Sequence, residues 1–540
     1  GLRTATRVSG TCTRGSTGAA GSAGCKRPPA REDCMKRPRT ESSASGAAAK
    51  GLLRPPACDT LTAAVPRIMK NGASTENLVL GASRQAGELR ARLRRLTRYS
   101  AVLEIYQPGL VLQLSEVLEG FQIILQGRVI YEGRAVVTAL INAGTMLIGE
   151  VRLDEGSFRL SSFSPGEDPA PLHEGFQAFL GHWQKLYRVR PAFKVVVADM
   201  QTFLSDLRLW LEQTEVEIRA ARPGARAERE EAAAREIGRD MVPAFDAMHE
   251  RLESIAADLE PELRPVHQVF AQRLLHPLVL CAPFAHRTYH KPLGYAGDYE
   301  MVNMILRDPH EGGSLFAKVV NRWFLSQWPA RAHRNRIQYL KGLLREEARR
   351  RAARGQPLRV LSLGCGPARE IQEFLAEDAL GHPARFELWD FNEETTRHVQ
   401  RVLEDCRRRH GRRVELDIRR QSVQQVIKEG ARAAPAPVRE YDFIYCAGLL
   451  DYLSDRIAAQ VMAGLYDWLA PGGRLAATNV EDCKPFRHML EFVLDWHLFY
   501  RNPAQSAALL PPGLSAARTR VLKDPTEVNV FVEARKPEHG

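Results

Sequence analysis

The stretch that most constrains the fold of this chain is Leu358–Glu370, which reads LRVLSLGCGPARE. An apolar run of strand length comes first, two glycines break it, and apolar residues at helical spacing follow. Such a strand–turn–helix unit directs backbone N–H groups and the positive end of the helix at a ligand. Gly364 and Gly366 permit close approach of that ligand, because a side chain at either position would collide with it. The sequence therefore predicts a cofactor site at this turn.

Four further strands and a closing hairpin are expected after the turn. Asp390 stands at the carboxyl end of the strand Arg385–Trp389, where an acid can accept hydrogen bonds from both hydroxyls of a ribose. The other strands and the hairpin arms are expected at Val414–Ile418, Tyr441–Cys446, the segment ending at Asn479, Thr519–Leu522 and Val528–Ala534. Strands that alternate with helices predict an α/β fold with a doubly wound sheet and an antiparallel edge. Nicotinamide, flavin and S-adenosylmethionine sites all use such a turn, so the turn alone leaves the cofactor open.

Four motifs of this region together resemble those of class I S-adenosylmethionine-dependent methyltransferases. They are LGCGPA at Leu363–Ala368, the acid Asp390, the strand end YDFIYCAGLLDYL that begins at Tyr441, and LAPGGRL at Leu469–Leu475. The resemblance implies a Rossmann-like, seven-stranded methyltransferase sheet over residues 331–540. It also implies S-adenosyl-L-methionine as the cofactor. A nicotinamide cofactor is the alternative, which the LAPGGRL turn and the terminal hairpin disfavour.

The resemblance further implies which residues hold the cofactor. Gly364 and Gly366 would face its methionine part, and Asp390 its ribose. The family usually carries an acid where this chain has Ser362, and Glu370 in the first helical turn could take over part of that role. The full set expected at the cofactor is Gly364, Cys365, Gly366, Glu370, Asp390, Asn392 and Gly448, with Gln421 and Ser422 beside the adenine.

Charge and cysteine usage disfavour several other classes of protein. The net charge of +12 is concentrated in residues 1–70, which hold 13 Lys and Arg against 4 Asp and Glu. A nearly neutral body does not suit a surface that tracks phosphates, so no nucleic-acid partner is expected. No apolar run reaches the roughly 18 residues of a membrane-spanning helix, so no integral membrane segment is expected. The nine cysteines lack the spacing of a zinc site, which favours a cytoplasmic protein with reduced thiols and no metal.

The N-terminal part of the chain is expected to hold a tail and a small β-barrel. Residues 1–74 are rich in Gly, Ala, Ser, Arg and Pro, so we expect a disordered basic tail, or an over-extended start with translation beginning near Met69. A basic helix over Glu88–Tyr99 and the strands after it predict a barrel within residues 88–160. The strands are expected at Ala101–Tyr106, Leu110–Ser115, Phe121–Leu125, Arg128–Tyr131, Gly133–Asn142 and Thr145–Leu153.

The barrel region is similar in part to the PilZ domain, which binds cyclic di-GMP through an RxxxR arm and a DxSxxG strand. Arg94 and Arg98 supply the first element. The second element is degraded, because Gln113 stands where the acid belongs, before Leu114-Ser115, and Gly120 is displaced. The resemblance implies a cyclic dinucleotide as a partner of the barrel.

Apolar residues at helical spacing predict a helical domain over residues 170–330, with Trp183 and Trp210 in its core. This domain is also where the interface of a homodimer would be expected. Within it, Thr288–Ile305 reads TYHKPLGYAGDYEMVNMI. A loop so dense in aromatic and ionisable groups, just ahead of a cofactor domain, suits a lid over an active site. An aromatic-packed turn between helices is the alternative.

The string YHKPLGYAGDYEMVN, with GCGPARE and the segment from Asn479 to Arg501, resembles bacterial methyltransferases that make 3-hydroxy fatty acid methyl esters. Such esters, 3-hydroxypalmitic acid methyl ester among them, are secreted quorum-sensing signals. The resemblance runs from about Leu103 to the end of the chain. It implies O-methylation of a fatty acid carboxylate, with an acidic lipid-like small molecule as the partner.

Methyl transfer from a sulfonium is an in-line displacement, so positioning supplies most of the rate. A carboxylate is ionised at neutral pH and needs orientation rather than a general base. Arg501 or His488 could hold it, and Trp496 could wall the sulfonium by cation–π contact. For His488 and Trp496 a packed helix face explains the pattern equally well. The residues expected at the acceptor are Tyr295, Tyr299, Asn479, Tyr500 and Arg501, and Asp451 and Tyr452 are further candidates near the same strand ends.

Two other functions fit the same sequence. One is a methyltransferase that acts on a protein side chain or an amine. The other is a regulatory protein in which a nucleotide-sensing barrel governs a weak methyltransferase domain, a hypothesis that the intact Asp390 and glycine pair disfavour. A long apolar pocket would favour the fatty acid, and an open acidic groove would favour a protein or amine acceptor.

Overall fold

The computed structural model describes residues 78–83, 87–105, 110–125, 128–142, 147–154, 157–158, 177, 180, 188–377, 383–430 and 440–538. The predicted N-terminal tail and Trp183 lie outside the described residues. From Ala73 onward the chain forms one compact unit. Among the described residues, no helix combines the length and the apolar character needed to cross a membrane.

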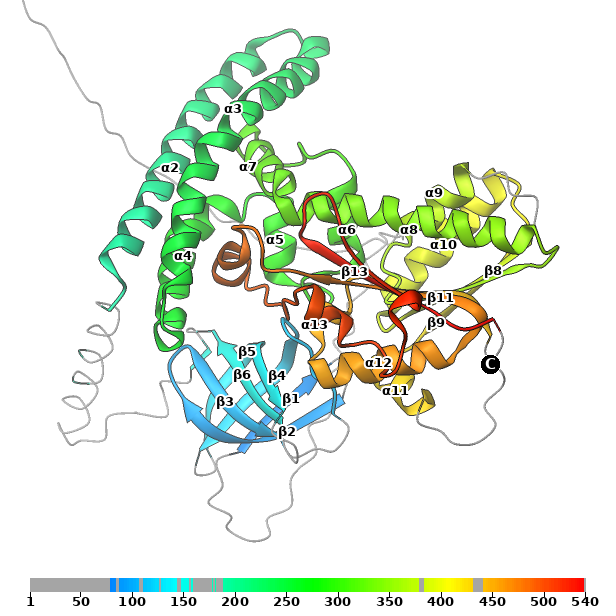
Figure 1. Cartoon of the computed structure of the whole chain (residues 1–540). Helices are drawn as coiled ribbons and strands as arrows, with labels where there is room; N and C mark the ends of the chain where they lie inside the picture. Colours follow the sequence, from blue (N-terminus) through cyan, green and yellow to red (C-terminus); the bar gives the residue numbers. More distant parts are fainter. Residues whose placement is uncertain are drawn as a thin grey trace, which may run out of the picture. The chain divides into compact units, whose positions relative to one another are not determined.

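Six antiparallel strands close into a barrel in the order β1–β2–β3–β6–β5–β4 (Figure 1). They are β1 (Leu78–Ser83), β2 (Gly87–Leu96), β3 (Ser100–Ile105), β4 (Val117–Leu125), β5 (Arg128–Asn142) and β6 (Leu147–Leu153). Every second side chain points inward, and Leu103, Phe121 and Tyr131 are fully buried in the barrel core. The predicted small β-barrel is confirmed.

Three local predictions in the barrel region are wrong. The stretch Glu88–Tyr99 is largely strand β2 and not a helix, because its apolar residues recur at every second position and fill the barrel. Arg128–Tyr131 and Gly133–Asn142 are not two strands but parts of the single strand β5. Leu110–Ser115 is a loop and not a strand, because its backbone bonds to other segments and turns at Ser115.

Helices follow the barrel, as predicted for this region. They are α2 (Pro191–Ala220), α3 (Pro223–Ala257), α4 (Arg264–Val279), α5 (Pro283–His290), α6 (Tyr299–Leu306) and α7 (Leu315–Ser326), with a short turn η3 (Pro261–Leu263). The prediction that Trp210 lies in the core is wrong, since its side chain is 53% exposed while Met200 and Leu204 on another face of α2 are buried. A 3.6-residue rhythm identifies a helix, but packing decides which face is covered.

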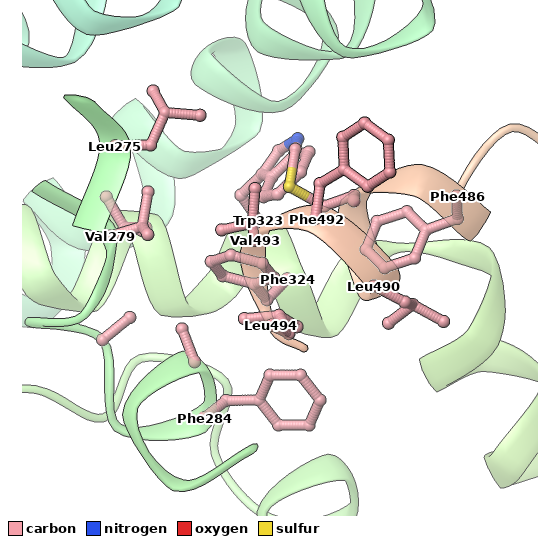
Figure 2. Packing of buried hydrophobic residues seen from close by; sticks show 14 of the residues in the cluster. Leu275, Val279, Phe284, Trp323, Phe324, Phe486, Leu490, Phe492, Val493 and Leu494 are labelled. Carbon is pink, nitrogen blue, oxygen red and sulfur yellow. The ribbon is translucent and has the colours of Figure 1, made fainter. Parts of the chain in front are cut away.

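The core of the helical region also takes in a segment from the C-terminal part of the chain. Figure 2 shows Trp323 and Phe324 of α7 close to residues of the π-helix η5 (Met489–Val493). Leu275 and Val279 of α4 belong to the same buried cluster. Because this core is shared, the helical region and the C-terminal sheet are fixed to one another by apolar packing.

The C-terminal region holds a seven-stranded sheet in the order β12–β13–β11–β10–β7–β8–β9. The strands are β7 (Leu358–Leu363), β8 (Ala384–Asp390), β9 (Val414–Arg420), β10 (Tyr441–Cys446), β11 (Leu469–Val480), β12 (Thr519–Lys523) and β13 (Asn529–Arg535). Strands β7 to β11 pair in parallel, and β13 pairs with β11 and β12 in antiparallel fashion. The predicted α/β sheet with an antiparallel edge is confirmed.

Helices cover both faces of this sheet. On one face α8 (Trp328–Ala352), α9 (Arg369–Glu377) and α10 (Glu393–Arg409) pack against Val360 and Phe443. On the other face α11 (Val423–Gly430) and α12 (Asp455–Asp467) pack against Leu361 and Ile444. Burial on both faces explains why these strands are continuous apolar runs in the sequence. Three short helices complete the region: η4 (Leu450–Tyr452), α13 (Pro503–Ala507) and η6 (Ala516–Arg518).

Candidate active site

A pocket of about 1100 Å³, including its open mouth, lies at the carboxyl ends of β7, β8 and β10. The chain leaves β7 toward α9 on one face of the sheet and leaves β10 toward α12 on the other face. Connections that diverge from neighbouring parallel strands leave a crevice between them, which is where open α/β sheets bind ligands. The pocket therefore occupies the place that the topology favours for a ligand.

Eight of the predicted site residues line this pocket. The turn after β7 has left-handed backbone at Gly364 (φ +66°) and Gly366 (φ +51°), which keeps its floor free of side chains. The residues that the pocket brings together are Tyr295, Gly364, Cys365, Gly366, Glu370, Asp390, Gln421 and Gly448.

Asp390 ties the glycine turn to the next crossover. Its Oδ2 accepts a hydrogen bond from Gly366 N at 3.3 Å, and its Oδ1 accepts one from Asn392 N at 3.0 Å. Burial raises the pKa of Asp390 to about 6, against the lowering effect of these backbone donors. The carboxyl group is therefore largely ionised at neutral pH. It lines the pocket and can accept hydrogen bonds from a bound ligand.

Glu370, in the first turn of α9, is a buried acid beside the glycine turn. Its carboxylate accepts a hydrogen bond from Tyr445 Oη at 2.6 Å. Burial raises the pKa of Glu370 above its ordinary value. Ser362 and Glu370 both line the pocket, so an acid is available beside the glycine turn although it comes from α9.

Asn392 and Ser422 stand just outside the pocket lining. Asn392 is the N-cap of α10, where its Oδ1 accepts a hydrogen bond from Thr395 N at 3.1 Å. Ser422 Oγ accepts a hydrogen bond from Gln425 N at 3.3 Å at the start of α11. Both side chains serve the helices that flank Asp390 and Gln421.

Of the five residues expected at the acceptor, Tyr295 lines the pocket. The further candidates Asp451, Tyr452 and Trp496 line it as well, whereas Tyr299, Asn479, Tyr500 and Arg501 are not among its lining residues. The ring of Tyr295 lies 5.0 Å from that of Phe391, and burial raises the pKa of its hydroxyl well above the usual value. Tyr299 Oη donates to Glu394 at 2.8 Å. The guanidinium carbon of Arg487 lies over the ring of Tyr500, 4.8 Å from the centre of that ring.

Arg501 is engaged in a structural joint. Its guanidinium donates to Asp455 Oδ1 at 2.8 Å, to Leu450 O at 2.8 Å and to Asn479 Oδ1 at 2.6 Å, and it also donates to Leu453 O. These acceptors lie on β11, on η4, just after η4 at Leu453 and at the first residue of α12. Arg501, one of the two side chains predicted to hold a carboxylate, therefore has its donors occupied by the protein itself.

The sequence interpretation missed Arg336, which α8 contributes to the pocket. Its side chain is only 7% exposed, and within the described part of the chain it makes no hydrogen bond or ion pair. Burial lowers its pKa, although Asp451 and Glu370 act in the opposite direction. A buried guanidinium with no partner is costly, so its place in a pocket points to an anionic ligand group. The available signal was an arginine on the apolar face of α8, in register with Leu340 and Leu344.

The sequence interpretation also missed His333. This residue lies about one helical turn before Arg336, on the same side of α8. Its Nδ1 lies 2.8 Å from Pro329 O, and burial lowers the pKa of the imidazole to about 3. The ring is therefore neutral at pH 7, with Nδ1–H donating to the carbonyl and Nε2 available as an acceptor. His333 lines the pocket beside Arg336.

The remaining wall is largely apolar and aromatic. Trp496 Nε1 donates to Tyr452 Oη at 3.0 Å. A Cβ on Gly297 would lie 2.3 Å from Tyr452 Oη, so only glycine admits this phenol. The apolar members of the lining include Met301, Val302, Ile337, Leu340, Val480 and Leu498.

The segment predicted as a lid is folded against this wall. Asp298 caps α6 by accepting from Met301 N at 2.8 Å, and it also accepts from Arg287 Nε at 2.8 Å. Gly297, Met301 and Val302 from the same segment line the pocket. Whether the segment opens and closes stays a prediction.

No protein-family model matches the chain, and no curated protein matches it. A structure from Bordetella parapertussis, described as a possible exported protein, is 19% identical over 59% of this chain and 100% of its own, with a TM-score of 0.36. Magnesium protoporphyrin IX methyltransferase from Synechocystis with bound SAH is 15% identical over 38% of this chain and 84% of its own, with a TM-score of 0.29. The N-methyltransferase NodS from Bradyrhizobium japonicum is 15% identical over 47% of this chain and 100% of its own, with a TM-score of 0.26. Likenesses this distant do not assign an activity, which therefore has to come from the pocket.

Proposed function

We propose that this chain is an S-adenosylmethionine-dependent methyltransferase that esterifies the carboxylate of a fatty acid, with a 3-hydroxy fatty acid as the expected acceptor. The observation that carries the proposal is one pocket that combines a glycine turn, the buried acid Asp390 and Arg336, a buried cation with no hydrogen-bond or ion-pair partner among the described residues. Each of these three features is costly or restrictive in an empty protein, and each suits a part of the cofactor or the acceptor.

The residues present fit the cofactor. Gly364 and Gly366 leave room for its methionine part, and Asp390 can accept hydrogen bonds from the ribose hydroxyls. Gln421 and Glu370 line the same pocket, and they are proposed to lie beside the adenine and the methionine amine, respectively. When bound, the cofactor supplies an electrophilic methyl group, and the chain's part is to bind it and to exclude water.

Arg336 would bind a carboxylate, since a planar guanidinium matches this group with two parallel hydrogen bonds. The methionine part of the cofactor and a fatty acid each carry one. The neutral His333 and the phenol of Tyr452 line the same pocket and offer polar contacts that do not neutralise the acceptor's charge. The apolar lining from α6 and α8 suits an alkyl chain.

Asn479 and Arg501 are proposed to act indirectly on the acceptor. Their mutual hydrogen bond holds the end of β11 against η4, and β11 contributes Val480 to the pocket. Tyr295 is proposed to contact the acceptor itself. The roles of Tyr299 and Tyr500, a homodimer and a cyclic dinucleotide at the barrel stay predictions.

An amine acceptor is the second candidate, and Asp451 favours it. This buried carboxyl lines the pocket, and burial raises its pKa. Its Oδ1 accepts from Val480 N at 2.6 Å. An amine must lose a proton when it is methylated, and a carboxylate of raised pKa is a better general base than an ordinary one.

Calorimetry followed by mass spectrometry tests the proposal. S-adenosylmethionine is titrated into the protein, and 3-hydroxypalmitate is then added and the mixture analysed for its methyl ester. Cofactor binding with ester formation supports the proposal. Cofactor binding with methylation of an amine in a mixed acceptor pool, and no ester, supports the second candidate. No cofactor binding contradicts both.

A further inference from the structure

The loop Leu110–Glu116, called here the barrel loop, connects the barrel to the pocket of the C-terminal sheet. Leu114 N donates to Tyr452 O at 3.2 Å, and Val117 N, just after the loop, donates to Gly294 O at 2.8 Å. Val111 is buried in the same apolar cluster as helices α11 and α12. The barrel is therefore joined to η4 and to the predicted lid by backbone hydrogen bonds and apolar packing.

Ser115 fastens the loop to the segment that carries Trp496. Its backbone is left-handed, with φ +60°, a strained conformation for a residue other than glycine. Ser115 Oγ donates to His497 O at 2.9 Å and also accepts from His497 N. Trp496 and Leu498, on either side of that histidine, both line the pocket. Strain of this kind persists only where the surroundings enforce it. Here the strained Ser115 connects the barrel loop to the segment that carries Trp496 and Leu498.

Gln113 is the residue through which the barrel reaches the pocket. Its side chain is 2% exposed and forms part of the lining. The residues that follow it bond to this part of the pocket, since Leu114 N donates to Tyr452 O and Ser115 bonds to His497, the neighbour of Trp496. Gln113 therefore faces the part of the pocket assigned to the acceptor.

Glu116 holds the loop that carries Gln113. Its Oε2 accepts from Gln113 N at 3.0 Å, and its Oε1 accepts from Ser83 Oγ of β1. Its backbone carbonyl accepts from Val137 N of β5 at 2.9 Å. The position of Gln113 is thus tied to β1 through the buried side chain of Glu116 and to β5 through the backbone of the same residue.

We propose that Gln113 is a specificity-determining residue for the methyl acceptor, presented by the barrel, and that Glu116 is the positioning residue that holds it. The proposal rests on the proposed function. A primary amide both donates and accepts hydrogen bonds, which suits the hydroxyl group that distinguishes a 3-hydroxy fatty acid from the unsubstituted acid. In this arrangement the barrel is a wall of the active site.

The test measures cofactor and acceptor binding separately in the full chain. S-adenosylhomocysteine is titrated first, and then 3-hydroxypalmitate or palmitate is titrated into the loaded protein. We expect Gln113→Leu to keep the affinity for S-adenosylhomocysteine within about twofold. Its affinity for 3-hydroxypalmitate should fall by about three- to tenfold, as for the loss of one neutral hydrogen bond. Palmitate should be unaffected. Gln122→Leu is the matched control, since Gln122 bonds to the exposed Glu132 on the same barrel.

The positioning role has its own readout. Glu116→Gln keeps a carbonyl oxygen for Gln113 N–H and should retain the preference for the hydroxylated acid, whereas Glu116→Leu should lose it with unchanged S-adenosylhomocysteine binding. Should Gln113→Leu fail to fold, Gln113→Asn shortens the side chain by one methylene and is expected to reduce the same preference. An unchanged preference in the Gln113 variants overturns the inference. A wild-type protein that binds S-adenosylhomocysteine but neither acid overturns it as well, and one that binds no S-adenosylhomocysteine overturns the proposed function first.

Discussion

The guanidinium of Arg336 lies directly against Gly448, so that a Cβ added to this glycine would stand 2.8 Å from Arg336 Nη1. Gly448 follows β10 and has φ +88°, in the left-handed region that favours glycine. One residue therefore provides both the backbone turn and the space that the buried cation occupies.

Gly448→Ala is expected to weaken cofactor binding by tenfold or more. The new methyl group would displace Arg336, and the left-handed backbone would add strain of about 1–3 kcal/mol. Isothermal calorimetry with S-adenosylhomocysteine measures the effect. Gly355→Ala is the control, because Gly355 also has positive φ (+65°) but has open space around its Cβ position. Equal affinities in the two variants would show that Gly448 does not shape the site.

Arg336→Met is expected to reduce function while leaving the fold intact. Loss of hydrogen bonds to a charged ligand group costs about 1.5–3 kcal/mol, or roughly 10- to 150-fold in affinity. The thermal midpoint should be unchanged or higher, because an unpaired buried charge has been replaced by an apolar side chain. A lowered thermal midpoint together with unchanged ligand affinity in this variant would contradict the proposal that Arg336 binds a charged group of the ligand.

Arg501→Met is expected to behave in the opposite way. It removes four hydrogen bonds and leaves buried acceptors unsatisfied, so the free energy of unfolding should fall by about 2–4 kcal/mol. The affinity of the protein that remains folded should be near that of the wild type. Urea denaturation and calorimetry on the same sample separate the two arginines. A stable Arg501 variant that does not bind the acceptor would restore Arg501 as a direct ligand.

Cofactor affinity is expected to fall as the pH is lowered through about 6. The folded pKa of Asp390 is raised to about 6 by burial, so this carboxyl takes up a proton over that range. Ribose hydroxyls donate to the ionised form, and each pH unit below the pKa should therefore weaken binding by about tenfold. The sign for stability is the reverse: the protonated form is the better buried one, so this contribution to stability is present at low pH and is lost as the pH rises through 6. Asp390→Asn should bind weakly at all pH values without this slope; an identical slope in that variant would assign the effect to another group.

The pair Arg152–Asp495 is expected to be essential for joining the barrel to the rest of the chain. Arg152 Nε donates to Asp495 Oδ1 at 2.7 Å, and the two side chains are 9% and 0% exposed. Burial alone would raise the pKa of Asp495, but Arg152 and Lys291 hold it well below its usual range. Arg152→Met leaves a buried carboxylate without its main partner and should cost about 3–5 kcal/mol in the free energy of unfolding.

The control for that measurement is Arg251→Met. Arg251 pairs with Asp199 at 3.1 Å, but both side chains are about half exposed, so the change should stay within about 1 kcal/mol. Similar losses in the two variants would mean that the Arg152–Asp495 pair contributes no more than a surface ion pair.

Much of the C-terminal fold could be predicted from local patterns. Short sequence patterns predict the strand before Gly364, the acid at Asp390 and the terminal hairpin. Strand length, glycine turns and burial on both faces each depend on residues within one short stretch, so each can be recognised in the sequence. The glycine turn, Asp390, Gln421 and Gly448 meet in one pocket for the same reason, since the carboxyl ends of parallel strands share one edge.

The barrel shows where local patterns mislead. Alternation identified its strands, but the arginines between Leu89 and Leu96 gave β2 the composition of a solvated helix. The loop around Gln113 alternates as a strand would, yet its partners lie more than 300 residues away, at Tyr452 and His497. Sequence separation of this size leaves no local signal.

The sequence by itself determined that a cofactor-type turn opens a doubly wound sheet, because those features depend on neighbours within a few residues. Only the tertiary structure decided which arginine faces the pocket. Arg336 and Arg501 are equivalent as isolated side chains, but the acceptors that occupy Arg501 come from three separate elements, and none reaches Arg336 in the described part of the chain. The charge available to a ligand is thus the charge that packing leaves unpaired.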